Sequence, residues 1–218
     1  MIDYAAARQA MVDRQIRPSD VTSYAIISAL LDVPREVFLP DALKPLAYFG
    51  DPLILGEGRV MLDPWSFAKL MEAVELKRDD LVLDLGCGYG YSTAVIARLA
   101  EAVVAVEEDE AMARAAEEAL GQLGVDNALV HHGPLRDGAP AHGPYDVVLV
   151  EGGIGEFPEA IADQVKIGGR IGAIFSEGPF YGQGRLGLRT EEGVTWRRVF
   201  DSTAPVLPGF ERVKTFEF

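Results

Sequence analysis

The segment spanning residues 81–100 constrains the fold of this 218-residue chain more than any other. The run Leu81-Val-Leu-Asp-Leu85 leads directly into Gly86-Cys-Gly-Tyr-Gly90, and a helical pattern follows over residues 93–100. A strand, a glycine turn and a helix in this order form a β-α unit. Because glycines let the backbone turn sharply and approach a ligand without a Cβ in the way, the turn is also a candidate ligand site.

The alternation of apolar runs and helical patterns continues along the chain. Further strands are predicted at residues 103–107, 128–131, 145–150 and 170–175, and helices at residues 110–123 and 158–165. Parallel strands joined by right-handed helical crossovers satisfy this alternation most simply. The predicted fold class is therefore α/β, a Rossmann-like, doubly wound and mostly parallel sheet with helices on both faces.

Both ends of the chain extend this core. The N-terminal part is predicted to contain helices and loops, at residues 4–31 (helical, broken near Pro18), 33–52 (irregular) and 65–74 (helical). After residue 185, two alternating segments flank Glu191-Glu-Gly193, and residues 210–218 alternate again. These patterns predict an N-terminal helical extension and a C-terminal antiparallel hairpin at the sheet edge.

Charge and composition exclude several classes of partner. The chain has 20 Lys and Arg against 34 Asp and Glu, a net charge of −14, and no basic run, so an extended DNA or RNA partner is disfavoured. The N-terminus lacks a basic region followed by an apolar stretch, and no run of about 18 apolar residues occurs, so we expect a cytoplasmic protein with no membrane partner. Cys87, the single cysteine, is expected to be a small residue in a tight turn.

The spacing of the glycines favours one class of ligand. Gly86, Gly88 and Gly90 follow the pattern G-x-G-x-G, whereas the dinucleotide pattern G-x-G-x-x-G would place a glycine at Tyr91. Asp84 stands two positions before the first glycine. This arrangement favours a nucleoside-sulfonium ligand over a pyrophosphate and opposes an NAD-dependent oxidoreductase. A tight strand-to-helix turn without a ligand is the alternative interpretation.

Acidic residues and loops after the other strands complete the predicted site. Glu107 ends the second strand, where an acid can accept hydrogen bonds from both ribose hydroxyls; alternatively, residues 107–110 are only an acidic helix N-terminus. The loop His131-His-Gly-Pro134 is where an adenine would lie, and its histidines have no partners at metal-ligand spacing. Glu151, after the fourth strand, is either an active-site wall residue or an ordinary loop carboxylate.

A second set of residues is more specific than the glycine loop. These residues are Ala10, Met11, Gln15, Val33-Pro-Arg-Glu36, Phe38, Pro40, Ala47-Tyr48, Asp51-Pro-Leu53, Gly56-x-Gly58, Tyr91, Pro144-Tyr-Asp146, Pro158, Gln164 and Gly168-Gly169. Through them the chain resembles the protein-L-isoaspartate O-methyltransferase family over about residues 10–174. The resemblance implies protein repair: S-adenosylmethionine as cofactor, S-adenosylhomocysteine as product, and methylation of the side-chain carboxylate of L-isoaspartyl residues in damaged proteins.

The resemblance also assigns residues and regions. It implies cofactor-binding residues at Asp84, Gly86, Gly88, Gly90, Tyr91, Ser92, Glu107, Glu108, Gly133, Pro134 and Glu151, and acceptor-side candidates at Arg59, Leu62, Asp63 and Glu151. We expect one methyltransferase domain over residues 1–218. It would comprise N-terminal helices and an acceptor-side loop (1–75), a cofactor-binding core (76–176) and C-terminal edge strands (177–218). The oligomeric state is not predicted.

The chain departs from the family at three places. The family's Gln-Thr-Ile-Ser segment aligns with Arg59-Val-Met-Leu62, so both hydroxyls are missing, and losing a hydroxyl donor costs roughly 1–3 kcal/mol. The family's adenine-binding Asp aligns with Pro134, and its Thr-Ala-Ala segment aligns with Glu151-Gly-Gly153. Arg59 is a candidate to pair with the acceptor carboxylate instead; the alternative is a surface contact with Glu57 or Asp63.

Two further functions stay open at this stage. Val60 and Leu62 make the acceptor side more apolar, which is compatible with a small-molecule acceptor in place of a peptide. A protein that binds S-adenosylmethionine without catalysing transfer is the third possibility. For the isoaspartyl reaction no general base is needed, because the acceptor carboxylate is already ionised at neutral pH.

Overall fold

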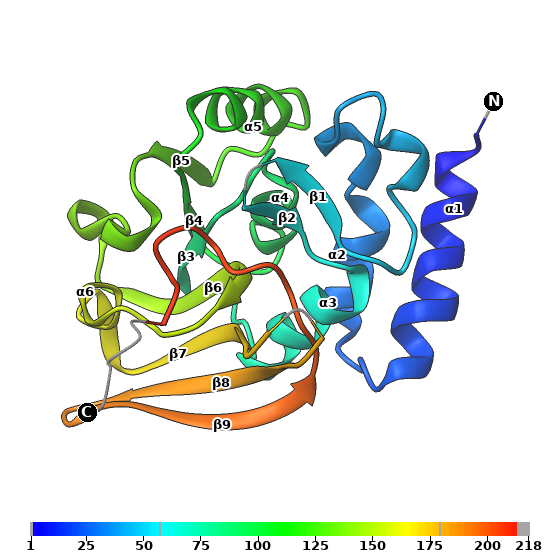
Figure 1. Ribbon diagram of the computed structural model, residues 1–218. Helices are drawn as coiled ribbons and strands as arrows, with labels where there is room; N and C mark the ends of the chain where they lie inside the picture. Colours follow the sequence, from blue (N-terminus) through cyan, green and yellow to red (C-terminus); the bar gives the residue numbers. More distant parts are fainter. Residues whose placement is uncertain (1, 57, 179, 213–218) are drawn as a thin grey trace.

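The computed structural model describes residues 2–56, 58–178 and 180–212. Its centre is a seven-stranded sheet in the order β5-β4-β3-β6-β7-β8-β9 (Figure 1). Neighbouring strands from β5 to β7 are parallel, whereas β8 is antiparallel to both β7 and β9. The strands are β3 (Leu81–Leu85), β4 (Ala102–Glu107), β5 (Ala128–His132), β6 (Tyr145–Ile154), β7 (Val165–Ser176), β8 (Gly182–Thr190) and β9 (Gly193–Asp201).

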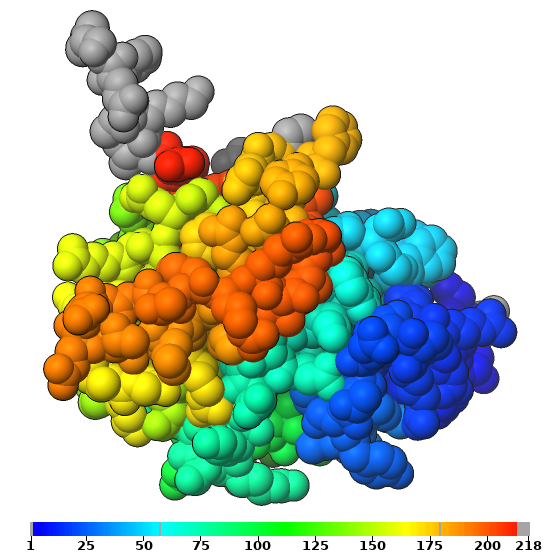
Figure 2. All heavy atoms as spheres, turned by 90° about the horizontal axis from the view of Figure 1, so that it is seen from below, coloured from blue at the N-terminus to red at the C-terminus, as the bar shows by residue number. Residues whose placement is uncertain are grey.

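Helices lie between the parallel strands and ahead of the sheet. The connecting helices are α4 (Tyr91–Ile96), α5 (Glu110–Gln122) and α6 (Glu159–Ala162). The N-terminal part contains α1 (Tyr4–Met11), a π-helical turn (Val12–Ile16), a 3-10 turn (Arg17–Ser19), α2 (Tyr24–Asp32) and α3 (Pro64–Ala73). Further 3-10 turns are Arg35–Phe38, Lys44–Leu46, Leu135–Asp137 and Pro140–His142. In Figure 2 the N-terminal helices, in blue, and the β8–β9 hairpin, in orange, lie on opposite sides of the molecule.

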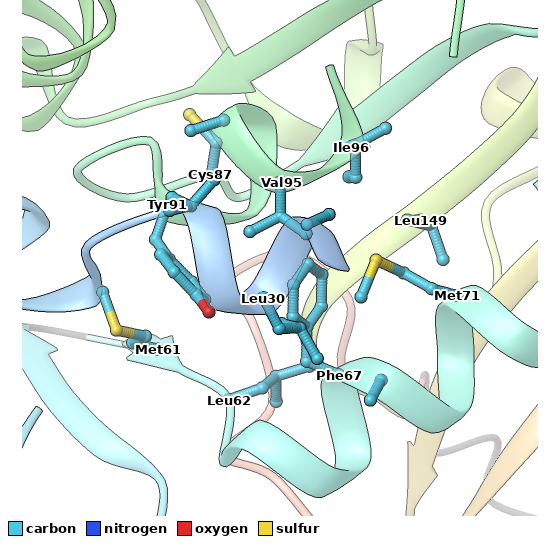
Figure 3. Packing of buried hydrophobic residues seen from close by; sticks show 14 of the residues in the cluster. Leu30, Met61, Leu62, Phe67, Met71, Cys87, Tyr91, Val95, Ile96 and Leu149 are labelled. Atoms are coloured by element: carbon cyan, nitrogen blue, oxygen red, sulfur yellow. The ribbon is translucent and has the colours of Figure 1, made fainter. Parts of the chain in front are cut away.

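The middle strands are apolar along most of their length because both faces of the sheet are covered. Successive side chains alternate between the faces, so Val82 packs with the N-terminal helices while Leu83 and Leu85 pack on the opposite face. Figure 3 shows the first face, where side chains from α2, α3 and α4 meet: Leu30, Phe67, Met71 and Val95. This packing fixes the strand ends that carry the candidate site.

The predicted fold class is confirmed, including the helical extension and the antiparallel hairpin at the sheet edge. The predicted helix over 158–165 is wrong beyond Ala162, because Val165 already pairs with Tyr145 in the sheet. Sheet pairing here outweighs a local helical pattern. Of the alternating segment 210–218, residues 213–218 lie outside the described residues, and residues 210–212 form no strand.

A small two-stranded sheet was not predicted from the sequence. β1 (Leu53–Gly56) and β2 (Arg59–Met61) form an antiparallel hairpin within a stretch whose prolines and glycines indicated only loop structure. In Figure 1 this hairpin lies near α4 and the ends of the central strands. It carries part of the predicted acceptor side, so its placement determines what that side contacts.

The C-terminal segment of residues 203–210, called the strap below, runs over the carboxyl end of β6 (Figure 1, red). Gly153 forms a parallel bridge with Val206. The Gly153 N–H donates to the Pro205 carbonyl at 2.8 Å, and the Leu207 N–H donates to the Gly153 carbonyl at 2.9 Å. These bonds hold the strap over the edge of the sheet where parallel strands place their ligands.

Within the described ranges, no helix combines the length and apolar character that a membrane span requires. The organisation of the whole chain as one domain with three parts stays a prediction.

We predict that Gly153→Ala destabilises the protein by about 1–3 kcal/mol. A Cβ at this position would lie 2.3 Å from the Ala204 carbonyl oxygen and 2.6 Å from the Ser176 hydroxyl, so the strap must shift. Urea unfolding followed by circular dichroism measures the change. Gly121→Ala is the control, because its Cβ meets nothing within 4 Å and α5 should gain about 0.5–1 kcal/mol. Equal stability of Gly153→Ala and wild type would contradict this account.

Candidate cofactor and acceptor site

The glycine loop joins β3 to α4 through three left-handed residues. Gly86, Gly88 and Gly90 have φ angles of 80°, 56° and 92°, a region in which other L-residues are strained. The Gly86 N–H donates to the Val106 carbonyl at 2.9 Å, which ties the loop to the end of β4. The sequence motif therefore has a backbone reason at each glycine.

Asp84 lies under the loop with its side chain fully buried. Its Oδ2 accepts hydrogen bonds from the Ser92 and Thr93 hydroxyls, each at 2.7 Å. Burial raises the pKa of Asp84 to about 6, and these two hydrogen bonds oppose that rise. Its Oδ1 has no partner within the described part of the chain, so one buried carboxylate oxygen remains available to a ligand or water.

Glu107, the predicted ribose acceptor, is also fully buried at the end of β4. Its Oε2 accepts from the Gly88 N–H at 2.9 Å. Its Oε1 accepts from the Glu108 and Asp109 N–H groups at 2.8 and 2.9 Å and from Arg59 Nε at 2.7 Å. Oε1 is therefore crowded with three donors, while Oε2 has room for one more. The pairing with Arg59 was not predicted.

Arg59 comes from β2 and is only 5% exposed. Besides the bond to Glu107, its Nη2 lies 3.4 Å from Glu108, whose side chain is 45% exposed. The expected alternative, a surface contact with Asp63, is wrong, because Asp63 Oδ1 accepts from the Ser66 N–H and caps α3. The other alternative partner, Glu57, lies outside the described residues.

The loop after β5 is the predicted adenine site. The Gly133 N–H donates to the Glu107 carbonyl at 3.1 Å, and Pro134 begins the 3-10 turn that follows. The side chain of Leu135, buried behind this turn, reaches toward Gly86. His132 Nε2 lies 3.1 Å from the Glu108 carbonyl oxygen. No group of three potential metal ligands occurs among the residues that the structure describes.

A small cavity of about 10 Å³ lies between the glycine loop and the β1–β2 hairpin. Four predicted site residues, Gly86, Tyr91, Ser92 and Glu151, meet here with the acceptor-side Leu62. The other lining residues are Arg35, Leu55, Val60, Met61, Phe67 and Cys87. Figure 3 shows Tyr91, Cys87, Met61 and Leu62 around this part of the core. A cavity of this size holds about one water.

Arg35 is the functional candidate that sequence reasoning missed. It is fully buried, its Nη2 donates to the Leu62 carbonyl at 2.5 Å, and its guanidinium lies 4.7 Å from the centre of the Tyr91 ring. Its Nε and Nη1 have no hydrogen-bond partner in the described structure. The residue stands within the Val-Pro-Arg-Glu segment of the family resemblance, which was the only sequence signal for it.

Glu151 lines the same cavity and is buried. Its predicted position after the fourth strand is wrong, because β6 continues to Ile154, and Glu151 is therefore a strand residue and not a loop carboxylate. Its Oε1 has no partner in the described parts of the chain. Burial, with a smaller contribution from Asp84, raises the pKa of Glu151 well above 4.5, while Arg35 lowers it. A raised pKa favours the protonated acid, which can donate a hydrogen bond. The burial of the neighbouring Cys87 thiol raises its pKa too, so it is not an activated nucleophile.

Two segments cover the glycine loop. Leu55, on β1, would lie 2.9 Å from a Cβ on Gly88, and Leu207, on the strap, would lie 3.4 Å from one on Gly86 and 2.7 Å from one on Gly152. Leu207 is fully buried by these contacts. The hairpin and the strap therefore close the site in this conformation.

The residues present fit a nucleoside-sulfonium cofactor in most respects. The three glycines of the loop, the open oxygen of Asp84 and the acid that ends β4 are the features such a ligand requires. Pro134, however, offers no carboxylate to an adenine. The side chains of Leu55, Arg59 and Leu207 lie over the loop and must move aside for a ligand of this size.

Comparison with known proteins identifies the family. A family model described as protein-L-isoaspartate(D-aspartate) O-methyltransferase matches residues 6–175. The chain belongs to this family. A protein-L-isoaspartate O-methyltransferase 1 of Rhodopseudomonas palustris is 38% identical over 168 residues, which cover 77% of this chain and 69% of that protein. One from Methylorubrum extorquens is 38% identical over 186 residues, covering 85% and 80%.

Solved structures of the family share the fold. A protein-L-isoaspartate O-methyltransferase structure superposes with a TM-score of 0.80 at 24% identity, covering 94% of this chain and 66% of that one. A Plasmodium falciparum structure in complex with S-adenosylhomocysteine gives 0.75 at 18% identity, covering 95% and 99%. These comparisons confirm the predicted family and, with it, the predicted class of S-adenosylmethionine-dependent methyltransferases. The roles of individual residues stay predictions.

The pKa of Asp84 yields a test of the buried carboxylate. The pKa of Asp84 is about 6 in the folded protein and 3.8 in the reference state. The folded protein therefore binds this proton more tightly than the unfolded chain does, and the resulting contribution to the free energy of unfolding is complete below pH 4 and is lost as the pH rises to 6. Asp84→Asn should therefore be more stable than wild type at pH 7 by about 2–3 kcal/mol. This difference should vanish near pH 4. Chemical unfolding at both pH values measures it, and a difference that does not change with pH would contradict the assignment.

Proposed function

We propose that the protein transfers a methyl group from S-adenosylmethionine to the side-chain carboxylate of L-isoaspartyl residues in damaged proteins, as a repair step. Membership of the family supports this reaction. The observation that carries it for this chain is the buried Arg35 guanidinium, which lines the cavity beside the glycine loop and has two nitrogens without a hydrogen-bond partner in the described structure. An acceptor carboxylate would satisfy these donors and balance the buried charge.

The reaction needs few catalytic groups. S-adenosylmethionine, when bound, supplies a methyl group that the positive sulfur already activates. One bond forms between the acceptor carboxylate oxygen and the methyl carbon, and one breaks between the methyl carbon and sulfur. The acceptor is ionised at neutral pH, so the protein's part is to orient it and exclude water. The apolar side chains of Leu55, Val60 and Leu62 suit the second task.

Arg35 and Glu151 replace the hydroxyls that the family uses at the acceptor side. Arg35 supplies a cation, and the protonated acid of Glu151 supplies a neutral hydrogen-bond donor. An ionised Glu151 would repel an acceptor carboxylate, so its raised pKa is what makes the pair compatible with this substrate. The partner we propose is thus a protein or peptide. We also propose that the reaction takes place in the cytoplasm, as the sequence predicts.

A second candidate function follows from the same glutamate. An acceptor with a hydroxyl group, such as an apolar small molecule, needs a general base, and an ionised Glu151 with a free oxygen could serve as one. The apolar lining by Val60, Met61 and Leu62 also suits such a molecule. The two candidate functions thus require different states of Glu151 during transfer: protonated for a carboxylate acceptor, ionised for a hydroxyl acceptor.

Methyl transfer to an isoaspartyl peptide, with the matching aspartyl peptide as control, tests the proposal. We expect a base-labile methyl ester on the isoaspartyl peptide alone. Arg35→Lys should lower kcat/KM about 10- to 100-fold, because a charge-assisted hydrogen bond to the acceptor is lost. Its affinity for S-adenosylhomocysteine should stay unchanged.

Glu151→Gln separates the two candidate functions. Glutamine keeps a donor but cannot act as a base, so transfer to the isoaspartyl peptide should fall by no more than a few-fold. Transfer to a hydroxyl acceptor, abolished by the same substitution, would favour the second candidate. Cofactor binding without transfer to any peptide would sink the first.

A further inference from the structure

Arg59 donates a hydrogen bond to Glu107, the carboxylate that we expect to bind the cofactor's ribose. Three of the four donors to Glu107 are backbone N–H groups of Gly88, Glu108 and Asp109, which the loop and the start of α5 hold in place. The fourth is the side chain of Arg59, at 2.7 Å. It is the one donor among these four that can leave by rotating side-chain bonds.

Arg59 and the two hydroxyls of the cofactor's ribose cannot all bind Glu107 at the same time. Each carboxylate oxygen accepts about two hydrogen bonds; Oε1 already accepts three, from Arg59, Glu108 and Asp109, whereas Oε2 accepts one, from Gly88. One further donor fits at Oε2, so two ribose hydroxyls can bind Glu107 together only when Arg59 leaves Oε1. The same movement is needed for a second reason, since Leu55 on the paired strand of the same hairpin lies against Gly88.

Displacement of Arg59 changes the charge of the neighbouring cavity. While paired, Arg59 and Glu107 neutralise each other and both are buried. Once its bond to Glu107 is broken, the guanidinium keeps only the longer contact to the half-exposed Glu108. Val60 and Met61, which follow Arg59 on β2, line the acceptor cavity, so the released cation lies within side-chain reach of it. A buried cation in this position favours an anionic partner.

We propose that Arg59 is a positioning residue that competes with the cofactor's ribose for Glu107 and, once displaced, pairs with the acceptor carboxylate. Binding is then ordered: the cofactor enters first, and its binding frees Arg59 as a second cation for the acceptor, in addition to Arg35. The competition depends only on cofactor binding, whereas the second step rests on the proposed function.

Calorimetry with S-adenosylhomocysteine tests the competition without any turnover. Arg59→Gln and Arg59→Met should bind it about 10-fold more tightly than wild type, because the competent state no longer requires an ion pair to break. Arg189→Gln is the control; it removes the more exposed ion pair between Arg189, on β8, and Asp163, and should leave the affinity unchanged. A 2′,3′-dideoxy analogue should lose more affinity in Arg59→Gln than in wild type. Circular dichroism checks that each variant is folded.

A measurement on the wild-type protein keeps the test independent of the variants. The Arg59 Nε–H signal in a nitrogen-15 NMR spectrum should be protected from exchange without ligand and lose that protection when S-adenosylhomocysteine is added. Weaker or unchanged binding by both Arg59 variants, or an Nε–H that stays protected, would overturn the competition.

The second step has its own readout. Wild-type protein should bind an isoaspartyl peptide at least 10-fold more tightly with S-adenosylhomocysteine than without it, and Arg59→Gln should lose this gain. Peptide binding that is the same with and without S-adenosylhomocysteine would overturn the second step. No peptide binding under either condition, together with intact competition at Glu107, would reject the proposed function and the second step while leaving the first.

Discussion

The buried carboxylate of Glu107 is the interaction on which the rest of the site depends. It joins the glycine loop through Gly88, the start of α5 through Asp109, and the β1–β2 hairpin through Arg59. Each of these segments belongs to a different part of the chain. A carboxylate removed from water must be hydrogen-bonded or paired, and the fold supplies four donors to this one. A ligand that binds this carboxylate therefore acts on the acceptor-side hairpin as well.

The acceptor side is built differently from what the family pattern implies. Val60 and Leu62 remove two hydroxyls, while Arg35 and Glu151 leave polar atoms unpartnered among the residues described. Buried polar atoms without partners are costly, and their concentration next to the glycine loop indicates a place where a substrate completes the hydrogen bonding. Apolar side chains and buried polar groups therefore line the same cavity, which suits an acceptor that is charged and shielded from bulk water.

Some of this architecture could be predicted from sequence, because it is encoded locally. The run before Gly86 and the three glycines determine a strand and a turn, and a helix begins directly after Gly90; the positive φ angles follow from the glycines. The pair Arg59–Glu107 could not be predicted, because its members are 48 positions apart and meet only when the hairpin folds over the loop. Leu207 is a similar case, since it lies outside the region that the family model matches.

A structure of the protein with S-adenosylhomocysteine bound tests the central claim most directly. The account predicts that both ribose hydroxyls lie within hydrogen-bond distance of Glu107, and that the 2.7 Å contact between Arg59 Nε and this carboxylate is broken. It also predicts that Leu55 and Leu207 have moved off the glycine loop. A complex in which Arg59 still donates to Glu107 would contradict the account.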